Sequence, residues 1–306
     1  MKNERVDEEL LEQISGLHSV PQGAYNIRKN GKSISRQSTA NIEVLPEKNG
    51  NGLEIRIKAN TKNESVHMPV ILTQSGLNEV VYNDFYVGEN AEVQIVAGCG
   101  IHNAGKDESK HDGIHRFFLE KNAKVKYIEK HIAIGTAGEK TMNPQTEIYL
   151  KAGSEFEMDT FQMEGVSRSV RKTSVVLEGD SKFTCMEKIV TKDNETASTN
   201  FVATMKGKGS SCHIVSRAVA RGESVQEFRS KVIGDAECFG HTECDCIVMD
   251  KARVTALPEV EALNSDANLV HEAAIGKIAG EQITKLMTMG LDEKQAEEQI
   301  IKGFLR

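Results

Sequence analysis

A short motif recurs along the middle of the chain and constrains the fold more than any other feature of the sequence. It consists of an apolar residue, three mainly polar or glycine positions, a small residue, one further position and then usually an apolar residue that begins a strand. Its copies are VGENAEV from Val87, LEKNAKV from Leu119, LKAGSEF from Leu150, LEGDSKF from Leu177, MKGKGSS from Met205, VIGDAEC from Val232 and VMDKARV from Val248. The first six copies start 32, 31, 27, 28 and 27 residues apart, and such a steady period is typical of a solenoid.

Each repeat has room for strands and a tight Gly/Asn/Asp turn, but not for a crossover helix. This favours an all-β core over residues 31–262, built as a parallel β-helix in which side chains alternate between a dry interior and the outer faces. The small Ala or Ser of the motif fits a crowded corner between stacked coils. A β-sandwich with similar hairpins is the alternative architecture, although sandwich strands recur at shorter spacing.

Helical patterns flank this core. Residues 1–30 are predicted to form a short helix (5–18) and a turn-rich linker, followed by strands at NIEVL and GLEIRIKA. Residues 263–306 are predicted to form a helical hairpin, in which Gly290 ends one helix and Asp292 caps the next with Gln295 three residues on. The hairpin either covers the open end of the solenoid or docks another protein, and both roles are compatible.

One insertion, GCGIHNAGKDESKHDGIHRF, lengthens the link between the first two repeats. It carries Cys99, His102, His111 and His115, which together suggest a metal site. The spacings are loose, however, so the pattern favours a solvated loop with surface histidines.

Composition excludes several classes of protein. The net charge of −7 argues against nucleic acid or an anionic membrane as the main partner. No apolar run is long enough to span a bilayer, and MKNERVDEEL lacks the apolar core of a secretion signal, so we expect a cytoplasmic protein. The six cysteines include no CxxC pair and are too scattered for a disulfide framework. With no Trp and only 5% aromatic residues, the core is expected to be built from aliphatic residues, Met and Cys.

Ligand-type side chains concentrate where the strand pattern gives way to the helical one, between His241 and Ile278. Two thiols (Cys244 and Cys246), two imidazoles (His241 and His271) and the carboxylate of Glu272 lie there. Thiolate is the ligand that iron–sulfur centres favour, and carboxylate or imidazole supplies weaker, labile ligands. The chemistry of the chain is therefore expected at this seam. Cys185, Cys212 and Cys238 are interpreted as buried apolar filler.

Three stretches resemble the SufB/SufD family, the scaffold components of SUF iron–sulfur cluster assembly: DGIHRFFLEKNAKVKYIEKH (112–131), NPQTEIYLKAGSEFEMDTFQMEG (143–165) and HEAAIGKIAGEQITKLMTMGLDEKQAEEQIIKGFL (271–305). The resemblance covers about residues 20–306. It implies a right-handed, flattened parallel β-helix with a helical C-terminal domain. It also implies a non-catalytic scaffold that holds a transient iron–sulfur cluster, and it leaves open whether a flavin takes part.

The resemblance also implies roles for single residues. TECD (242–245) matches a family motif that makes Cys244 a cluster ligand, and the H-E-A motif makes Glu272 the second, with Cys246, His271 and His241 as further candidates. Cys99 in AGCG occupies the place of a sulfur acceptor. The implied partners are a SufC-like ABC-type ATPase, a cysteine desulfurase or other sulfur donor, and a second copy of the chain or a SufB/SufD paralogue, paired near the last coils. Candidate ATPase-docking residues are Ile275, Ile278, Gln282, Ile283, Leu286 and Met287.

Two rival functions are weighed against the scaffold. Pectin-cleaving enzymes also use parallel β-helices, but this chain has no aromatic-rich sugar groove and no recognisable pair of catalytic carboxylates. The other rival is a structural or adaptor β-helix whose cysteines only pack.

Overall fold

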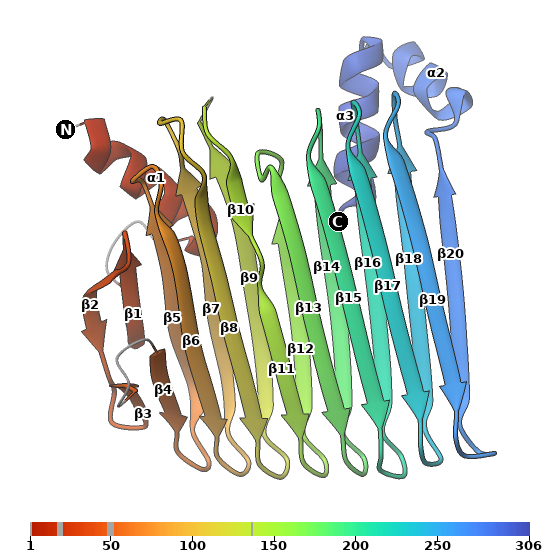
Figure 1. The fold of residues 1–306 in the computed structure, drawn as a ribbon. Coiled ribbons are helices and arrows are strands. Elements are labelled where there is room, and N and C mark those ends of the chain that lie inside the picture. Colours follow the sequence, from red (N-terminus) through yellow and green to blue (C-terminus); the bar gives the residue numbers. More distant parts are fainter. Residues whose placement is uncertain (1, 17–20, 48–51, 136) are drawn as a thin grey trace.

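The computed structural model describes residues 2–16, 21–47, 52–135 and 137–306, and within them two ten-stranded sheets lie face to face (Figure 1). Sheet A contains, in spatial order, β2 (Lys32–Gln37), β1 (Ala24–Lys29), β5 (Lys62–Leu72), β7 (Glu92–His102), β9 (Lys124–Ile134), β12 (Glu155–Gln162), β14 (Lys182–Thr191), β16 (Ser211–Ala220), β18 (Phe239–Val248) and β20 (Asn268–Gly276). Sheet B contains β19 (Arg253–Ala262), β17 (Val225–Gly234), β15 (Thr196–Met205), β13 (Arg168–Leu177), β10 (Lys140–Met142) with β11 (Gln145–Leu150), β8 (Ser109–Leu119), β6 (Asn78–Val87), β4 (Gly52–Ile57) and β3 (Ile42–Pro46).

The chain alternates between the two sheets, so that each strand pairs in parallel with strands of the preceding and following coils. Only the N-terminal hairpins β1–β2 and β3–β4 are antiparallel among the described strands. The predicted parallel β-solenoid is thereby confirmed.

The first six copies of the repeated motif form the turns that lead from sheet B to sheet A in successive coils, whereas the copy from Val248 forms a turn at the opposite end. The fourth residue of the motif adopts a left-handed backbone conformation in successive coils, as at Asn90, Asn122 and Asp180. This conformation favours Asn, Asp and Gly, which explains why those residues recur there. In the first four copies the small fifth residue is fully buried, and where it is serine its hydroxyl donates to a carbonyl of the same turn, as from Ser181 to Glu178 at 2.6 Å.

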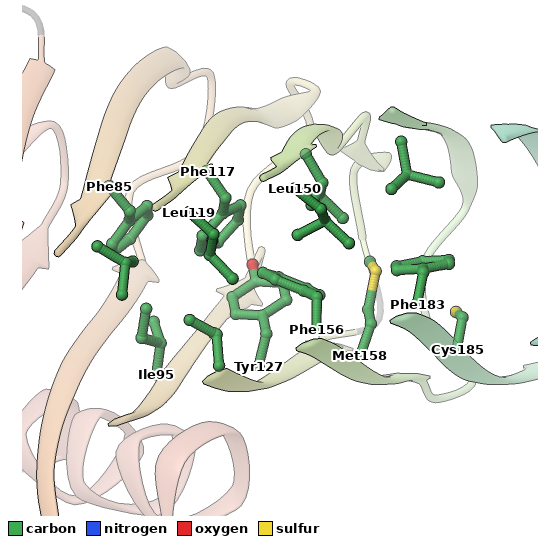
Figure 2. Close-up of a cluster of buried hydrophobic side chains, with 14 of the residues drawn as sticks. Phe85, Ile95, Phe117, Leu119, Tyr127, Leu150, Phe156, Met158, Phe183 and Cys185 are labelled. Carbon is green, nitrogen blue, oxygen red and sulfur yellow. The ribbon is translucent and has the colours of Figure 1, made fainter. Parts of the chain in front are cut away.

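The space between the sheets is filled by an apolar cluster that runs through most of the coils. Aromatic rings stack from coil to coil within it, as Phe85 and Phe117 do with their centroids 4.5 Å apart (Figure 2). Cys185, Cys212 and Cys238 belong to this cluster, in agreement with their interpretation as packing residues.

Two short helices, α2 (Gly280–Thr288) and α3 (Glu293–Phe304), follow the last coil, and α1 (Lys2–Ser15) precedes the first. The predicted capping box of Asp292 and Gln295 is present, and Gly290 follows α2 with a φ of 99°. Residues 17 and 18, the expected end of the first helix, lie outside the described residues. In the part of the chain that the structure describes, no helix is long and apolar enough to cross a membrane.

The expected helical start after residue 262 is wrong. Residues up to Gly276 form β20 in sheet A, and the first helix begins only at Gly280. Leu269, His271, Ala273 and Ile275 repeat with period two along one face of this strand, and pairing with β18 decides in favour of that period. Likewise, the expected N-terminal linker includes β1, which joins sheet A.

The predicted solvated loop at residues 98–117 is also wrong. Most of this insertion belongs to β7 and β8, and its histidines His111 and His115 are buried between the sheets. The segment SKHDGIHRF alternates strictly between inward and outward positions, which is a strand pattern that the irregular histidine spacing obscures.

Both α1 and α3 pack on the outer face of sheet A (Figure 1). Leu10 and Ile14 of α1 sit over Gly98 and Gly100, where an added Cβ would meet Ile14 at 3.2 Å and Leu10 at 3.0 Å. The two glycines of AGCG therefore let the helix approach the sheet behind Cys99.

Candidate functional site

Cys244 and Cys246 both point from β18 into the solenoid, at 1% and 4% exposure. The two thiols are two residues apart on the strand and therefore share its inner face. Burial raises the pKa of both thiols to about 12, so both are protonated at neutral pH in this closed state.

His271 and Glu272 lie on opposite faces of β20. Glu272 is in register with Glu243 of β18, and its side chain is 65% exposed on the outer face. His271 is in register with Thr242 and lies on the inner face, where the Thr242 hydroxyl is 3.1 Å from His271 Nδ1. The fold therefore places His271, and not Glu272, on the same face as Cys244.

A separate exposed group gathers around Glu272 on the outer face. His241 Nε2 lies 3.8 Å from a Glu272 carboxylate oxygen, and the rings of His241 and His213 stack with their centroids 5.0 Å apart. The candidate ligands thus divide into an inner set (Cys244, Cys246 and His271) and an outer set (His241 and Glu272). Among the described residues, no group of three or more His, Cys, Asp or Glu side chains has a geometry that holds a metal ion.

The last coil leaves the end of the solenoid open. β20 is paired only with β18, and β19 only with β17. Apolar side chains are exposed along these two edge strands and the turn between them, with Ile275 at 44%, Val260 at 48% and Leu263 at 60%. Since Ala273 is the neighbour of Cys244 on β20 and is itself exposed, Cys244 lies one strand away from this open edge.

Cys99 lies inside the solenoid near the other end of the molecule, at 1% exposure. It adjoins a cavity of about 10 Å³, roughly the space for one water, that is also lined by His111, His115, His131 and Glu129. Burial and the nearby carboxylates raise the pKa of the Cys99 thiol well above its ordinary value. His102, the remaining histidine of the insertion, ends β7 and is only partly buried.

A buried polar network extends from this cavity. The hydroxyl of Tyr127 donates to Glu129 at 2.9 Å and lies 2.9 Å from His115 Nδ1. Arg171 reaches across from sheet B and donates to Glu129, and its Nε lies 3.4 Å from Glu187. Burial disfavours the Glu129 carboxylate, but Arg171 and His131 outweigh this cost and hold its pKa below the usual range.

This network continues toward Cys244 along sheet A. Glu129, Thr160, Glu187, Ser216 and Cys244 are successive in-register neighbours on the inner faces of β9, β12, β14, β16 and β18; we call them the polar row. Glu187 accepts hydrogen bonds from Ser216 and Thr199, each at 3.0 Å. A polar row therefore connects the surroundings of Cys99 with Cys244, beside the apolar cluster of the interior.

The sequence pattern does not reveal the members of this row that precede Cys244, nor does it reveal Arg171. The segments KYIEKH, SVRKT and CMEKI each place charged residues on both strand parities, so their pattern does not show which charge points inward. The signal that was present is a charged residue flanked at i±2 by apolar ones, as at Glu187 between Cys185 and Ile189.

The candidate docking residues are distributed unevenly over the C-terminal segment. Ile278 packs with α3 against Val190, Val219 and Ile247, and it is therefore engaged within the chain. By contrast, α2 has no fully buried residue. Gln282 is exposed and Met287 is 45% exposed, whereas Ile283 and Leu286 are half-buried. Ile275 belongs to the open edge of β20 and not to a helix.

Comparison with known proteins identifies the family. The model of the SUF system FeS cluster assembly SufBD core domain matches residues 73–304. An iron–sulfur cluster assembly SufBD family protein of Archaeoglobus fulgidus is 31% identical over 227 residues, which cover 74% of this chain and 60% of the relative. One from Pyrococcus horikoshii is 28% identical over 286 residues, 90% of this chain and 84% of the relative. The SufB protein of Bacillus subtilis is 33% identical over 96 residues, 30% of this chain and 21% of the relative.

The family match spans most of the solenoid and both C-terminal helices, whereas the chain covers only 60% of the length of the Archaeoglobus relative. The match includes Cys99, the polar row, Cys244 and the edge strands of the last coil. The chain therefore belongs to the SufB/SufD family of the SUF iron–sulfur cluster assembly system.

Proposed function

We propose that this chain is a SufB-like scaffold that accepts sulfur at Cys99 and assembles a nascent iron–sulfur cluster at Cys244. The observation that carries the proposal is the polar row, which leads from the surroundings of Cys99 to Cys244. Burying several charged and hydroxyl side chains in a solenoid core is costly unless they are paired. A function that needs polar groups in the interior accounts for that cost.

Sulfur transfer to Cys99 proceeds by thiol–persulfide exchange. The Cys99 thiolate attacks the outer sulfur of a persulfide on a donor such as a cysteine desulfurase, a new S–S bond forms, and the donor cysteine leaves as its thiolate. Because burial raises the pKa of Cys99, the thiol must lose its proton as the donor engages. The neighbouring His131 is the in-register partner of Cys99, but burial lowers its pKa to about 3, so it is neutral and too weak a base to keep that proton. The proton passes instead to the departing donor thiolate, which becomes a thiol.

Cluster assembly takes place at the open end of the solenoid. Iron and sulfide are cargo here, and the inner set of Cys244, Cys246 and His271 supplies thiolate and imidazole ligands. Metal binding displaces the thiol protons, which overcomes the raised pKa of Cys244. Glu272 and His241 lie on the outer face of the same edge, where a second copy or a paralogue brings further ligands. A SufC-like ABC-type ATPase binds α2, close to β20.

Anaerobic reconstitution with iron and sulfide tests the cluster site. Wild-type protein should develop the visible absorption and Mössbauer spectrum of an iron–sulfur cluster, and Cys244→Ala should lose most of both. Cys212→Ala is the matched control, because Cys212 is equally buried in the interior but lies on β16, outside both candidate ligand sets. Single His271→Ala and Glu272→Ala variants then separate the inner from the outer set. Equal cluster uptake by wild type and Cys244→Ala would remove Cys244 from the site.

Persulfide loading tests the sulfur acceptor. Incubation with a cysteine desulfurase and cysteine should add one sulfane sulfur per chain, detected as a mass increase on the peptide that contains Cys99. Cys99→Ser should abolish this loading, whereas Cys185→Ser, which removes another buried thiol, should leave it unchanged. Loading that persists in Cys99→Ser excludes Cys99 as the acceptor.

A further inference from the structure

A cavity of about 510 Å³ lies between α3 and the outer face of sheet A. Its floor is formed by β9, β12 and β14, and α3 forms one wall. Ile128 and Phe161 from the floor and Ile301 and Leu305 from the wall give it an apolar surface. A cavity of this size and character lies within the range of small-molecule sites in proteins.

The wall is held rigidly against the sheet. Ile301 is buried against Val190, Val219 and Ile247 on the outer face, and Phe304 and Leu305 pack beside it. Arg217 also donates to the carbonyl oxygen of Phe304 at 3.1 Å. The cavity is therefore pre-formed and does not depend on the arrival of a ligand to order α3.

Positive charge surrounds the apolar surface. Two carboxylates, Asp159 and Glu298, project toward the cavity, whereas Glu129 belongs to its lining but directs its carboxylate to Arg171 in the interior. Against these two stand five cationic residues of the lining: Lys130, Lys188, Arg221, Lys302 and Arg306. The chain as a whole has a net charge of −7, so this excess of cations is a local feature that complements an anion.

We infer that this cavity binds a small amphipathic anion, in which a flat apolar group carries one negatively charged substituent. The apolar group lies on Phe161, Ile128 and Ile301, and the charged substituent faces Lys188 and Lys302. The site is distinct from the polar row, which occupies the inner faces of the same strands. It therefore goes beyond the proposed scaffold function and does not depend on cluster chemistry.

Anilinonaphthalene sulfonate, an aromatic sulfonate whose fluorescence rises in apolar surroundings, is the probe. Titration of the full chain should give one saturable site. Lys302→Glu and Lys188→Glu should each weaken the dissociation constant about tenfold, because an attractive charge becomes a repulsive one. N-phenylnaphthylamine, which lacks the sulfonate, should bind wild type about tenfold more weakly, because only the apolar contacts remain.

Lys172→Glu is the matched control, because Lys172 is exposed on the outer face of sheet B and should leave the dissociation constant unchanged. Lys188 is 18% exposed and lies 3.9 Å from Asp159, so the Lys188→Glu variant could lose stability and its folding is checked by thermal unfolding. Lys302 is exposed on α3, so Lys302→Glu tests the site without this complication. Wild-type affinity in Lys302→Glu, or an equal loss in Lys172→Glu, would overturn the inference. Equal affinity of the wild-type protein for N-phenylnaphthylamine and for anilinonaphthalene sulfonate would also overturn the inference.

Discussion

Arg171 determines the charge balance of the solenoid interior. Its guanidinium bonds Glu129 and approaches Glu187 at 3.4 Å, while its Nη2 lies 3.2 Å from His131. Burial is the main reason why the adjacent histidines stay neutral: it outweighs the attraction of Glu129, and the Arg171 charge adds to it. Burial lowers the pKa of His115 to about 4 and that of His131 to about 3, which keeps both uncharged at neutral pH.

The neutral state of His115 predicts a dependence of stability on pH. Its folded pKa lies below the unfolded value of about 6.5, so its contribution is fully present above pH 6.5 and is lost as pH falls toward 4. Over that interval the free energy of unfolding of wild type should decrease, with His115 accounting for up to roughly 3 kcal/mol. Denaturant unfolding at several pH values should show a shallower decrease in His115→Gln. His102→Gln, at the partly exposed end of β7, is the control and should keep the wild-type dependence of the free energy of unfolding on pH. If His115→Gln also keeps the wild-type dependence, His115 is not the group responsible.

At the scale of elements, the two C-terminal helices have different roles. Helix α3 is fixed to sheet A by Ile301 and by the Arg217 hydrogen bond to its last turn. Helix α2 buries none of its residues fully, and Met287 and the following Met289 are 45% and 74% exposed. Methionine is flexible and polarisable, and exposed methionines suit a surface that adapts to a partner. Helix α2 is therefore the better candidate for the ATPase contact, with α3 as its support.

A binding assay with a SufC-like ATPase tests that division. Replacement of Met287 and Met289 by Glu should weaken the complex at least about tenfold, since each change removes apolar contact and introduces an unpaired charge at the interface. Titration by calorimetry measures the loss, and thermal unfolding checks that the variant remains folded. Met163→Glu is the control, because Met163 is similarly exposed, at 43%, but lies in the turn between β12 and β13, outside the C-terminal helices. Unchanged binding by the double variant would place the contact elsewhere.

At the scale of the whole molecule, the two ends of the solenoid differ. The N-terminal edges are β2 and β3, each the outer strand of an antiparallel hairpin, and β2 is rich in polar and cationic residues. The C-terminal edges, β19 and β20, expose apolar side chains as well as unpaired backbone groups. An exposed edge of this kind is a template for pairing with another chain. We therefore propose that two copies, or this chain and a paralogue, join through β19 and β20.

Charge substitution at this edge should separate the two copies. Ile275→Lys combined with Val260→Lys places unpaired cations in the contact, and it should turn the dimer into a monomer in light scattering and sedimentation velocity. Ile34→Lys is the matched control, because Ile34 is 59% exposed on β2 at the opposite edge, and this variant should remain dimeric. A dimer that persists in the double variant would refute this mode of pairing. If the outer set of ligands is shared between copies, the monomer should also lose cluster loading.

The sequence by itself was sufficient to predict the parallel solenoid, the capping of α3 and the family, because each depends on local and repeated signals. A left-handed Asn, Asp or Gly followed by a small buried residue recurs at successive turns from Asn90 to Gly209, and the capping box of Asp292 needs only the residues of one helix turn. That Cys244 and Cys246 lie on the same face of their strand also follows from local geometry, because alternate residues of a strand share a face.

Only the tertiary structure decided which face each strand buries and which distant residues meet. Shifting a strand by one residue exchanges its two faces, and strands with charges on both parities do not specify the choice. The pairing of β20 with β18 therefore decided that His271 shares the inner face with Cys244 while Glu272 lies outside. The stacking of coils likewise brought Glu129, Arg171 and Glu187 together, because contacts between residues tens of positions apart depend on the register of several coils at once.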